Sequence, residues 1–300
     1  MKLATTTLDF VAHDLTNEEC VKRIYDAGFR YIDFGIGRNF LDDSNWRDNA
    51  KKLRDYAEHL GMKFIQMHSP EGNPLDLKER EQLVKLTNRS IEVCKIMGIP
   101  QTVVHSGWKA YISEEEYFEG NLEFYRQLFP TMEQTGVNVL IENSSSKNFL
   151  PEKYYYFITG KQMVDFLKYA DHSLLHAVWD TGHANTEGNQ YEHIMALGQE
   201  LYGLHIHDNS GCGDEHTVPY FGTLNMDDVM NALIDVDYKG YFTFEAVTAL
   251  RNSNNRHGKR HVFEKDSRLR EPSLEMQIDL ERLLYTIGKH CLTSYNVFEE

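Results

Sequence analysis

The chain repeats one local pattern along its length: an amphipathic stretch with helical periodicity, a turn that often contains glycine, and a short apolar segment. Apolar segments such as VVH and VLIEN lack the alternation of polar and apolar residues that marks a half-exposed strand. Continuous apolar strands are typical of parallel sheets that are buried on both faces. The pattern therefore predicts a parallel sheet in which helices connect successive strands.

Seven copies of this pattern can be counted, and the N-terminal segment LATTTLDF supplies an eighth strand. The seven turn-and-strand segments lie at residues 26–36, 59–68, 96–105, 134–143, 174–183, 200–208 and 237–246. Helical periodicity covers residues 17–27, 46–60, 76–97, 114–135, 160–171, 189–199, 226–235 and 273–290. Eight strands that alternate with eight helices predict an α/β fold, a single-domain (β/α)8 TIM barrel over residues 1–300. A doubly wound open sheet accommodates eight units less naturally.

Signals for the ends of helices support these boundaries. Thr16 and Ser113 each precede a glutamate by three positions, which is the spacing of a helix capping box. Glycines follow four of the predicted helices, where a backbone with positive φ ends a helix without steric cost. These glycines are Gly28, Gly61, Gly98 and Gly136.

Composition limits the partners and the location that we expect. The formal net charge is -15 and the pI is near 5.4, which argues against nucleic acid or a membrane surface as a partner. The mean hydropathy is -0.53, and neither a membrane helix nor the apolar stretch of a secretory signal is evident. The cysteines are scattered without metal-binding spacing, which fits reduced thiols in the cytoplasm. They are Cys20, Cys94, Cys212 and Cys291.

Polar residues stand where the predicted strands end. They are His68, His105, Glu142, Asp180, His183, His205, His207, Asp208 and Glu245. In a barrel these side chains should converge on one bowl, because all parallel strands end at the same face. A carboxylate buried after four apolar residues is costly unless a cation compensates its charge. Two glutamates, one aspartate and several histidines therefore predict a site for a divalent metal such as Mn²⁺, Zn²⁺, Fe²⁺, Co²⁺ or Mg²⁺, and no organic cofactor.

Two segments refine this prediction. In WDTGHAN (179–185), a strand-to-helix turn could direct Asp180 and His183 inward, with Gly182 keeping the bend uncrowded. In LHIHDN (204–209), alternation sends His205 and His207 to one face and Asp208 to the other. We expect His205 to bind the metal and His207 to contact substrate or to be structural.

The motifs IEN, DTGHAN, HIHDN, DEHxxPxxG and FEA, in this order, resemble the xylose-isomerase-like TIM barrel superfamily of sugar phosphate isomerases/epimerases and endonuclease IV. The resemblance covers essentially the whole chain and is compatible with a homo-oligomer. It implies that one metal ion is bound by four residues, as in the ketose 3-epimerases: Glu142, Asp180, His205 and Glu245. It also implies that His183 contacts substrate.

The same resemblance leaves a second assignment open. In endonuclease IV, three zinc ions use further ligands, and residues of matching type here are His68, His105, Asp214 and His216, with His183 at the third metal. These five residues are therefore expected to bind either substrate or additional metal. Residue types alone do not choose between the two.

We favour a metal-dependent isomerase or epimerase of a small sugar or polyol, phosphorylated or not. Glu142 and Glu245 would form a catalytic acid–base pair, one removing a proton from carbon and the other returning one. The alternative is a multi-zinc phosphodiester hydrolase, which needs a basic face for a nucleic-acid backbone. A lyase such as a dehydratase on the same metal site is a third option.

Two long connections follow predicted strands on the face where barrels place their sites, and long loops on that face are often lids. Residues 144–160 are rich in tyrosine, and their aromatic residues from Phe149 to Phe157, with Trp108, could pack on a sugar or simply on the protein. Residues 247–272 carry a dense basic run that either contacts an anionic group or is solvated. Its members are Arg251, Arg256, Lys259, Arg260, Lys265, Arg268 and Arg270.

Overall fold

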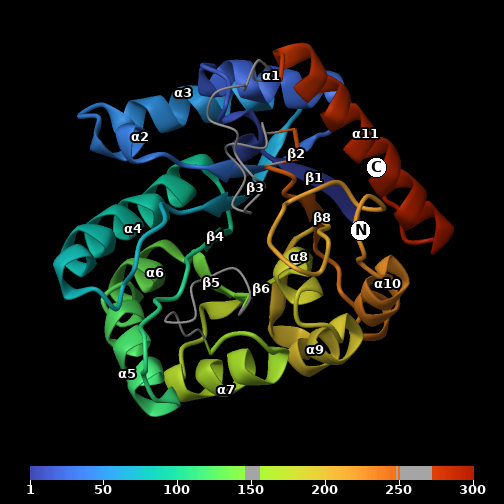
Figure 1. Ribbon diagram of the computed structural model, residues 1–300. Coiled ribbons are helices and arrows are strands. Elements are labelled where there is room, and N and C mark those ends of the chain that lie inside the picture. The colour runs from blue at the N-terminus through green and yellow to red at the C-terminus, as the bar shows by residue number, and fades with distance from the viewer. Residues whose placement is uncertain (146–155, 248, 251–271) are drawn as a thin grey trace, which may run out of the picture.

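The eight predicted strands are present and form one parallel sheet in a computed structural model, which describes residues 1–145, 156–247, 249–250 and 272–300 (Figure 1). Their order in the sheet is β7-β6-β5-β4-β3-β2-β1-β8. The strands are β1 (Lys2–Thr6), β2 (Tyr31–Gly35), β3 (Lys63–His68), β4 (Gln101–Val103), β5 (Asn138–Glu142), β6 (Leu175–Asp180), β7 (Leu201–His205) and β8 (Tyr241–Phe244). The predicted (β/α)8 barrel is confirmed.

The barrel closes between β7 and β8 through the residue after β7. The amide of Ile206 donates to the carbonyl of Thr243 at 2.7 Å, and the amide of Glu245 donates to the carbonyl of Ile206 at 3.1 Å. This closure places His205 and Glu245 on neighbouring strands. On the other side of β7, Asp180 pairs in register with His205. The register therefore brings the polar ends of three consecutive strands together.

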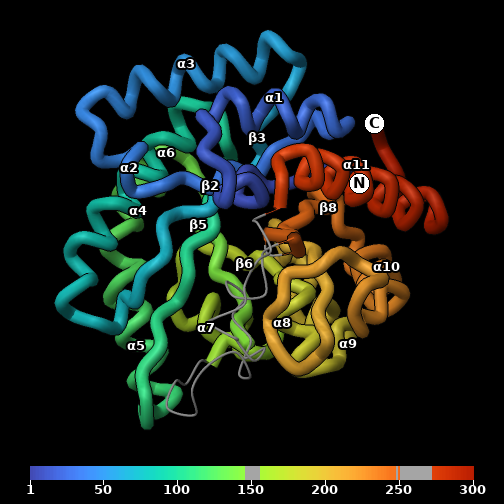
Figure 2. Tube along the Cα trace, turned by 45° about the horizontal axis from the view of Figure 1, so that its top comes forward, coloured from blue at the N-terminus to red at the C-terminus, as the bar shows by residue number. Residues whose placement is uncertain are grey.

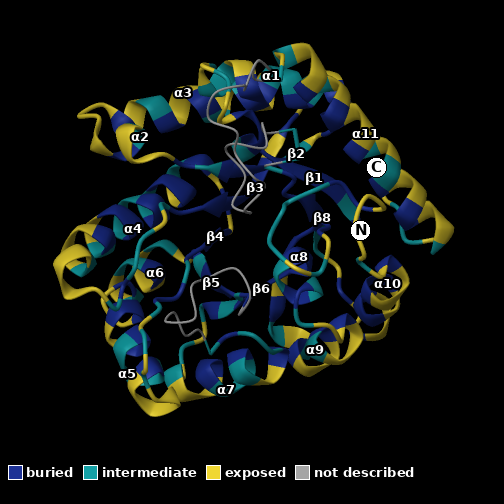
Figure 3. Ribbon diagram, in the orientation of Figure 1, coloured by how far each residue is buried: buried dark blue, intermediate teal, exposed yellow. Residues whose placement is uncertain are grey.

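Helices surround the barrel, with their buried faces turned toward the strands (Figures 1 and 3). They are α1 (Asn17–Ala27), α2 (Arg38–Asp42), α3 (Trp46–His59), α4 (Leu77–Met97), α5 (Glu114–Tyr125), α6 (Phe129–Thr135), α7 (Gly160–Ala170), α8 (Thr181–Asn185), α9 (Gln190–Leu197), α10 (Met226–Asp235) and α11 (Leu274–Ser294), with 3-10 helices η1 (Thr7–Phe10) and η2 (Gly198–Glu200). Among these described helices, none is both long and apolar enough to cross a membrane.

The predicted helix ends are largely confirmed. Both capping boxes form, at Thr16 with Glu19 and at Ser113 with Glu116. The four glycines predicted to end helices all have positive φ. The prediction of one helix over residues 114–135 is wrong, because residues 126–128 separate α5 from α6. Pro130 explains this break: proline is tolerated in the first turn of α6 but would disrupt the interior of a continuous helix.

The C-terminal helix α11 lies against the strands that complete the barrel, beside the N-terminus (Figure 2). A Cβ added to Gly288 would come within 2.5 Å of Leu3 and 2.8 Å of Phe244, so the absence of a side chain lets α11 approach β1 and β8 closely. Beyond the helix, the amino group of Met1 donates to the carbonyl of Val297 and to Glu299. The two ends of the chain are thereby joined at the amino-terminal side of the barrel.

Candidate metal centre

Four buried side chains from consecutive strands meet at the carboxyl end of the barrel. Glu142 ends β5, Asp180 ends β6, His205 ends β7, and Glu245 follows β8. One ligand atom from each of these four residues lies within 4.8 Å of the corresponding atoms of the others. The structure thus brings together the four residues predicted from the sequence as metal ligands, hereafter the tetrad.

Glu142 lies between two imidazoles. Its Oε1 is 2.7 Å from Nδ1 of His205, and its Oε2 is 2.6 Å from Nε2 of His105. Burial alone would raise the pKa of Glu142, but the two histidines outweigh that effect and hold the pKa well below its usual range. Glu142 is therefore an ionised carboxylate at neutral pH, as a metal ligand or a base must be.

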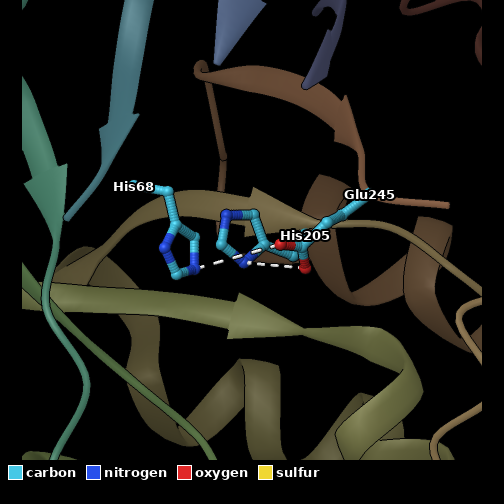
Figure 4. Close-up of side chains that lie close together, drawn as sticks. All are labelled: His68, His205 and Glu245. Atoms are coloured by element: carbon cyan, nitrogen blue, oxygen red, sulfur yellow. Dashed lines mark ion pairs between the residues drawn. The ribbon is translucent and has the colours of Figure 1, made fainter. Parts of the chain in front are cut away.

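His205 connects Glu142 with the second glutamate. Its Nδ1, already in contact with Glu142, is 3.5 Å from Oε2 of Glu245, while Nε2 of His68 is 3.9 Å from Oε1 of Glu245 (Figure 4). Burial lowers the pKa of His205, but Glu245 and Glu142 raise it well above its usual value. Without a metal, His205 therefore carries a proton that a metal ion would have to displace.

Asp180 belongs to the tetrad and also caps a helix. Its Oδ1 accepts the backbone amide of His183 at 2.6 Å and so caps the short helix α8. Asn143 holds the same turn, because its side chain bonds both the amide and the carbonyl of Asp180. The other oxygen, Oδ2, lies 2.9 Å from Nε2 of His207. The strand-to-helix turn predicted for this segment is present.

Gly182 leaves the space that His207 occupies. A Cβ at Gly182 would lie 1.9 Å from the imidazole of His207, so no other residue fits there without displacing that ring. As predicted, Asp208 turns away from His205 and His207. Its carboxylate accepts the amides of Gly222 and Leu224 and so closes the loop after β7.

A second group lies beside the tetrad and contains three other predicted residues. Oδ2 of Asp214 is 3.2 Å from Nε2 of His183 and 3.1 Å from Nε2 of His216. Burial lowers the pKa of His216, but Asp214 outweighs it and raises that pKa to about 10. Burial is likewise outweighed at His183, whose pKa Asp180 and Asp214 raise well above its usual value.

The remaining two predicted residues, His68 and His105, form a third group with Glu142. Their rings meet edge to face, with centroids 4.8 Å apart. Burial lowers the pKa of His105, but Glu142 outweighs it and the pKa is raised. All nine residues predicted for the site therefore lie in one continuous cluster, although their roles stay predictions.

The donor set and its unsatisfied atoms fit a divalent cation. Among the described residues, Oδ1 of Asp214 and Nδ1 of His207 are buried without a hydrogen-bond partner, and Oε2 of Glu142 approaches His105 without hydrogen-bond geometry. Buried polar atoms are almost always satisfied, so orphaned ones point to a missing ion or ligand. Imidazole and carboxylate together suit Mn²⁺, Zn²⁺, Fe²⁺ and Co²⁺.

The predicted lids contribute little to this description. The basic run at 251–270 and most of the tyrosine-rich connection, including Phe149, lie outside the described residues. Phe157 is fully buried against Phe166 and Tyr117, so it belongs to the protein core and does not face a sugar. Trp108 lies in the loop after β4, where Asn73 bonds its backbone amide and carbonyl.

Sequence reasoning missed two polar residues inside the barrel. Asp33 of β2 and Gln66 of β3 are buried beside His205, on the side away from the glutamates. The available signal was a carboxylate and an amide within otherwise apolar strands, YIDFG and KFIQMH. Neither residue stands at the end of its apolar run, which is where the predicted site residues lie.

Comparison with known proteins gives relatives of the same fold. A family model described as xylose isomerase-like TIM barrel matches residues 21–264. An uncharacterized protein of Methanocaldococcus jannaschii is 27% identical over 259 residues, covering 82% of this chain and 83% of the relative. Fructoselysine 3-epimerase of Shigella flexneri is 24% identical over 214 residues, covering 67% and 74%. The structure of D-psicose 3-epimerase from Clostridium cellulolyticum H10 matches with a TM-score of 0.76 at 16% identity, covering 97% of this chain and 99% of that one.

The closed parallel barrel, with its polar residues gathered at the carboxyl ends of the strands, defines a TIM-barrel protein. Because the family model spans most of the sequence, the chain belongs to the xylose isomerase-like TIM barrel family. The resemblance drawn from the sequence motifs is confirmed at this level.

Proposed function

We propose that this protein is a metal-dependent epimerase or isomerase of a small ketose-like sugar. One observation carries the proposal: the carboxylates of Glu142 and Glu245, from strands on different sides of the bowl, both lie against Nδ1 of His205, at 2.7 and 3.5 Å. Two relatives support it by their names, fructoselysine 3-epimerase and D-psicose 3-epimerase.

The chemistry requires two acid–base groups on opposite sides of one carbon. In epimerisation next to a carbonyl, one carboxylate removes a proton from carbon and the other returns a proton to the opposite face. Burial would raise the pKa of Glu142, but its two histidines lower it. Glu142 is therefore ionised and can accept a proton as a base. A divalent cation held by the tetrad would polarise the carbonyl and stabilise the negative charge that develops.

The surrounding histidines are placed to bind substrate hydroxyls. His183, His216, His68 and His105 border the tetrad, and each contacts a carboxylate that orients it. His68 is buried and the other three are half-buried, so their rings have limited freedom to turn. Such fixed donors and acceptors orient a polyhydroxylated molecule over the two glutamates.

Solvent isotope exchange tests this proposal. Protein loaded with Mn²⁺ is incubated in D₂O with a panel of free ketopentoses and ketohexoses and their phosphate esters, and carbon-bound protons are followed by NMR. We expect deuterium to enter at the carbon next to the carbonyl as a second epimer or isomer appears, because the returned proton comes from solvent-exchanged carboxylate. Loss of water from the same carbon framework would instead identify a dehydratase, and no exchange with any member would contradict the proposal.

A multi-metal phosphodiester hydrolase is the second candidate, and a specific observation favours it. The groups His183–Asp214–His216 and His68–His105–Glu142 each present three ligand atoms within 4.8 Å of one another, beside the tetrad. The same groups could hold further metal ions in place of substrate hydroxyls. Against this candidate stands the formal net charge of -15, which disfavours a polyanionic substrate. Nicking of abasic-site DNA by zinc-loaded protein would support it over the epimerase.

A further inference from the structure

His205 has two ring nitrogens with different surroundings, and the second of them contacts a residue that the site so far leaves unused. Its Nδ1 faces the two glutamates, whereas its Nε2 lies 3.2 Å from Oδ2 of Asp33. Both residues are fully buried, with exposures of 0% for His205 and 1% for Asp33. If Asp33 accepts a proton from Nε2, then Nδ1 is the nitrogen left with a lone pair that can bind a metal.

A chain of hydrogen bonds with a fixed direction reaches Asp33 through the barrel. The amide nitrogen of Gln101 donates to the carbonyl of Tyr202 at 3.1 Å and to Oε1 of Gln66 at 3.0 Å. A main-chain carbonyl can only accept, so it fixes the orientation of the Gln101 amide, and Gln101 in turn fixes that of Gln66. The nitrogen of Gln66 must then point toward Asp33, where it donates to Oδ2 at 2.9 Å.

The backbone is built to hold this chain. The pairing of β2 with β3 shifts register between Ile32 and Asp33 and skips Ile65 of β3, which sets Asp33 directly opposite Gln66. Across the barrel, a Cβ at Gly203 would lie 2.4 Å from Oε1 of Gln66, so the absence of a side chain in β7 leaves room for the amide. The register shift and Gly203 thus both accommodate the paired side chains of Asp33 and Gln66.

A role in stabilising the fold does not explain why an aspartate is buried at position 33. Its second oxygen, Oδ1, is buried without a hydrogen-bond partner among the described residues. A buried carboxylate that is only half satisfied costs free energy, and an apolar residue in its place would remove that cost. The arrangement is explained if the carboxylate acts on His205.

We propose that Asp33 is a positioning residue for the metal centre, accepting the Nε2 proton of His205 so that Nδ1 is presented to the cation. The side-chain nitrogen of Gln66 lies 3.0 Å from the same Nε2, where it could donate to the ring only if Nε2 carried no proton. With Nε2 protonated, as proposed, Gln66 and His205 both donate to Oδ2 of Asp33. Carboxylates that orient metal-bound histidines in this way typically contribute 10- to 100-fold in metal affinity. The inference rests on the metal centre of the proposed function but not on its substrate.

Asp33→Asn tests the assignment, because it keeps the shape and an acceptor oxygen but removes the negative charge that strengthens the bond from Nε2 of His205. We expect Zn²⁺ affinity, measured by competition with a chelator, to fall by about 10- to 100-fold. In the Zn²⁺-loaded wild-type protein, NMR should show His205 bound through Nδ1 with an Nε2 proton protected from exchange with water. In the variant that proton should exchange faster, because a neutral amide oxygen holds it less tightly than a carboxylate.

Thr102→Val is the matched control. Thr102 is fully buried in β4, next to β3, and its hydroxyl bonds the carbonyl of Met67 and the hydroxyl of Ser69. Replacing it also costs buried hydrogen bonds in the barrel, at a place that does not contact His205. Its Zn²⁺ affinity should stay within about twofold of wild type, because the ligands keep their orientation. If Asp33→Asn does not fold, Gln66→Met replaces it, since losing the amide leaves Asp33 unanchored and should also weaken Zn²⁺ binding.

Affinity in either barrel variant within twofold of the Thr102→Val control, or an unchanged protected Nε2 proton in Asp33→Asn, would overturn the assignment. None of these readouts uses turnover. A protein that shows no epimerase activity but loses Zn²⁺ affinity on changing Asp33 would refute the proposed function and leave this inference standing.

Discussion

The variants Glu142→Gln and Glu245→Gln should each lower turnover by about 10²- to 10⁴-fold, the usual contribution of a positioned general acid or base. Glutamine keeps the size of the side chain and an oxygen that can still face a cation, but it cannot take up a proton. Both carboxylates contact Nδ1 of His205, so either substitution removes one side of the acid–base pair. Steady-state rates with the substrate found by isotope exchange are the first measurement.

Isotope exchange separates loss of catalysis from loss of metal. If the two glutamates serve opposite faces of the carbon, each variant should still exchange the proton of one epimer while failing to convert it to the other. Metal content of each variant is measured in the same samples. A variant that fails only because it has lost its metal would show no exchange with either epimer until metal is supplied in excess.

Glu200→Gln provides the matched control for these variants. Glu200 pairs with His176 at 2.8 Å, a glutamate–histidine contact like that of Glu142, but at the opposite end of β6 from Asp180. Its loss should leave turnover within about twofold of wild type, since this pair is partly exposed and contributes little. Turnover of Glu142→Gln and Glu245→Gln equal to that of this control would refute the acid–base assignment.

Metal binding should expel protons, and their number should report how many ions bind. The pKa values of Glu142, Asp180 and Asp214 are each lowered: burial would raise them, but neighbouring histidines outweigh it. These carboxylates therefore have no protons to lose at pH 7. The protons come from histidines, whose pKa values carboxylates raise against the effect of burial. Those histidines are His105, His183, His205 and His216.

One ion at the tetrad requires only His205 to lose its proton, so about one proton per chain should be released at pH 7, and affinity should fall about tenfold for each unit of decreasing pH. Filling all three groups would release about four protons, since all four of these histidines would become ligands. Calorimetric titration with Zn²⁺ in buffers of different ionisation enthalpy gives the count. Heats that do not depend on the buffer would contradict this account of the charge state.

The control for proton release is His176→Gln, which removes a histidine–glutamate pair remote from the tetrad and should leave the count unchanged. His205→Gln should lower the number of protons released on Zn²⁺ binding by about one, because that histidine supplies the displaced proton. The two variants together separate release at the tetrad from release elsewhere in the protein.

The tetrad could be predicted from the sequence because each of its members ends an apolar strand, and parallel strands all end at one face of a barrel. The same reasoning found His183, whereas Asp214 and His216 stand in a loop and were predicted only from the resemblance of the sequence motifs to a known family. It could not find Asp33, because partnership between a residue of β2 and one of β7 depends on strand register and side-chain direction across the barrel.

Helix boundaries show the same limit at a local scale. Thr16 and Ser113 predicted helix starts correctly because their capping partners are only three residues away in sequence. Both capping boxes form. The break before α6 was missed because apolar periodicity continues across it, and only Pro130 marks the new start. Contacts near in sequence were therefore easier to predict than the point where one helix ends and the next begins.

The central claim is that Glu142, Asp180, His205 and Glu245 hold a divalent metal ion, and its most direct test is metal content after dialysis. Wild-type protein equilibrated with Zn²⁺ or Mn²⁺ and freed of excess metal should retain at least one ion per chain. The double variant Asp180→Ala, His205→Ala should retain none at the tetrad, with helical content unchanged by circular dichroism. Equal metal retention by a folded double variant, or no retention by wild type at any pH from 6 to 9, would contradict the account.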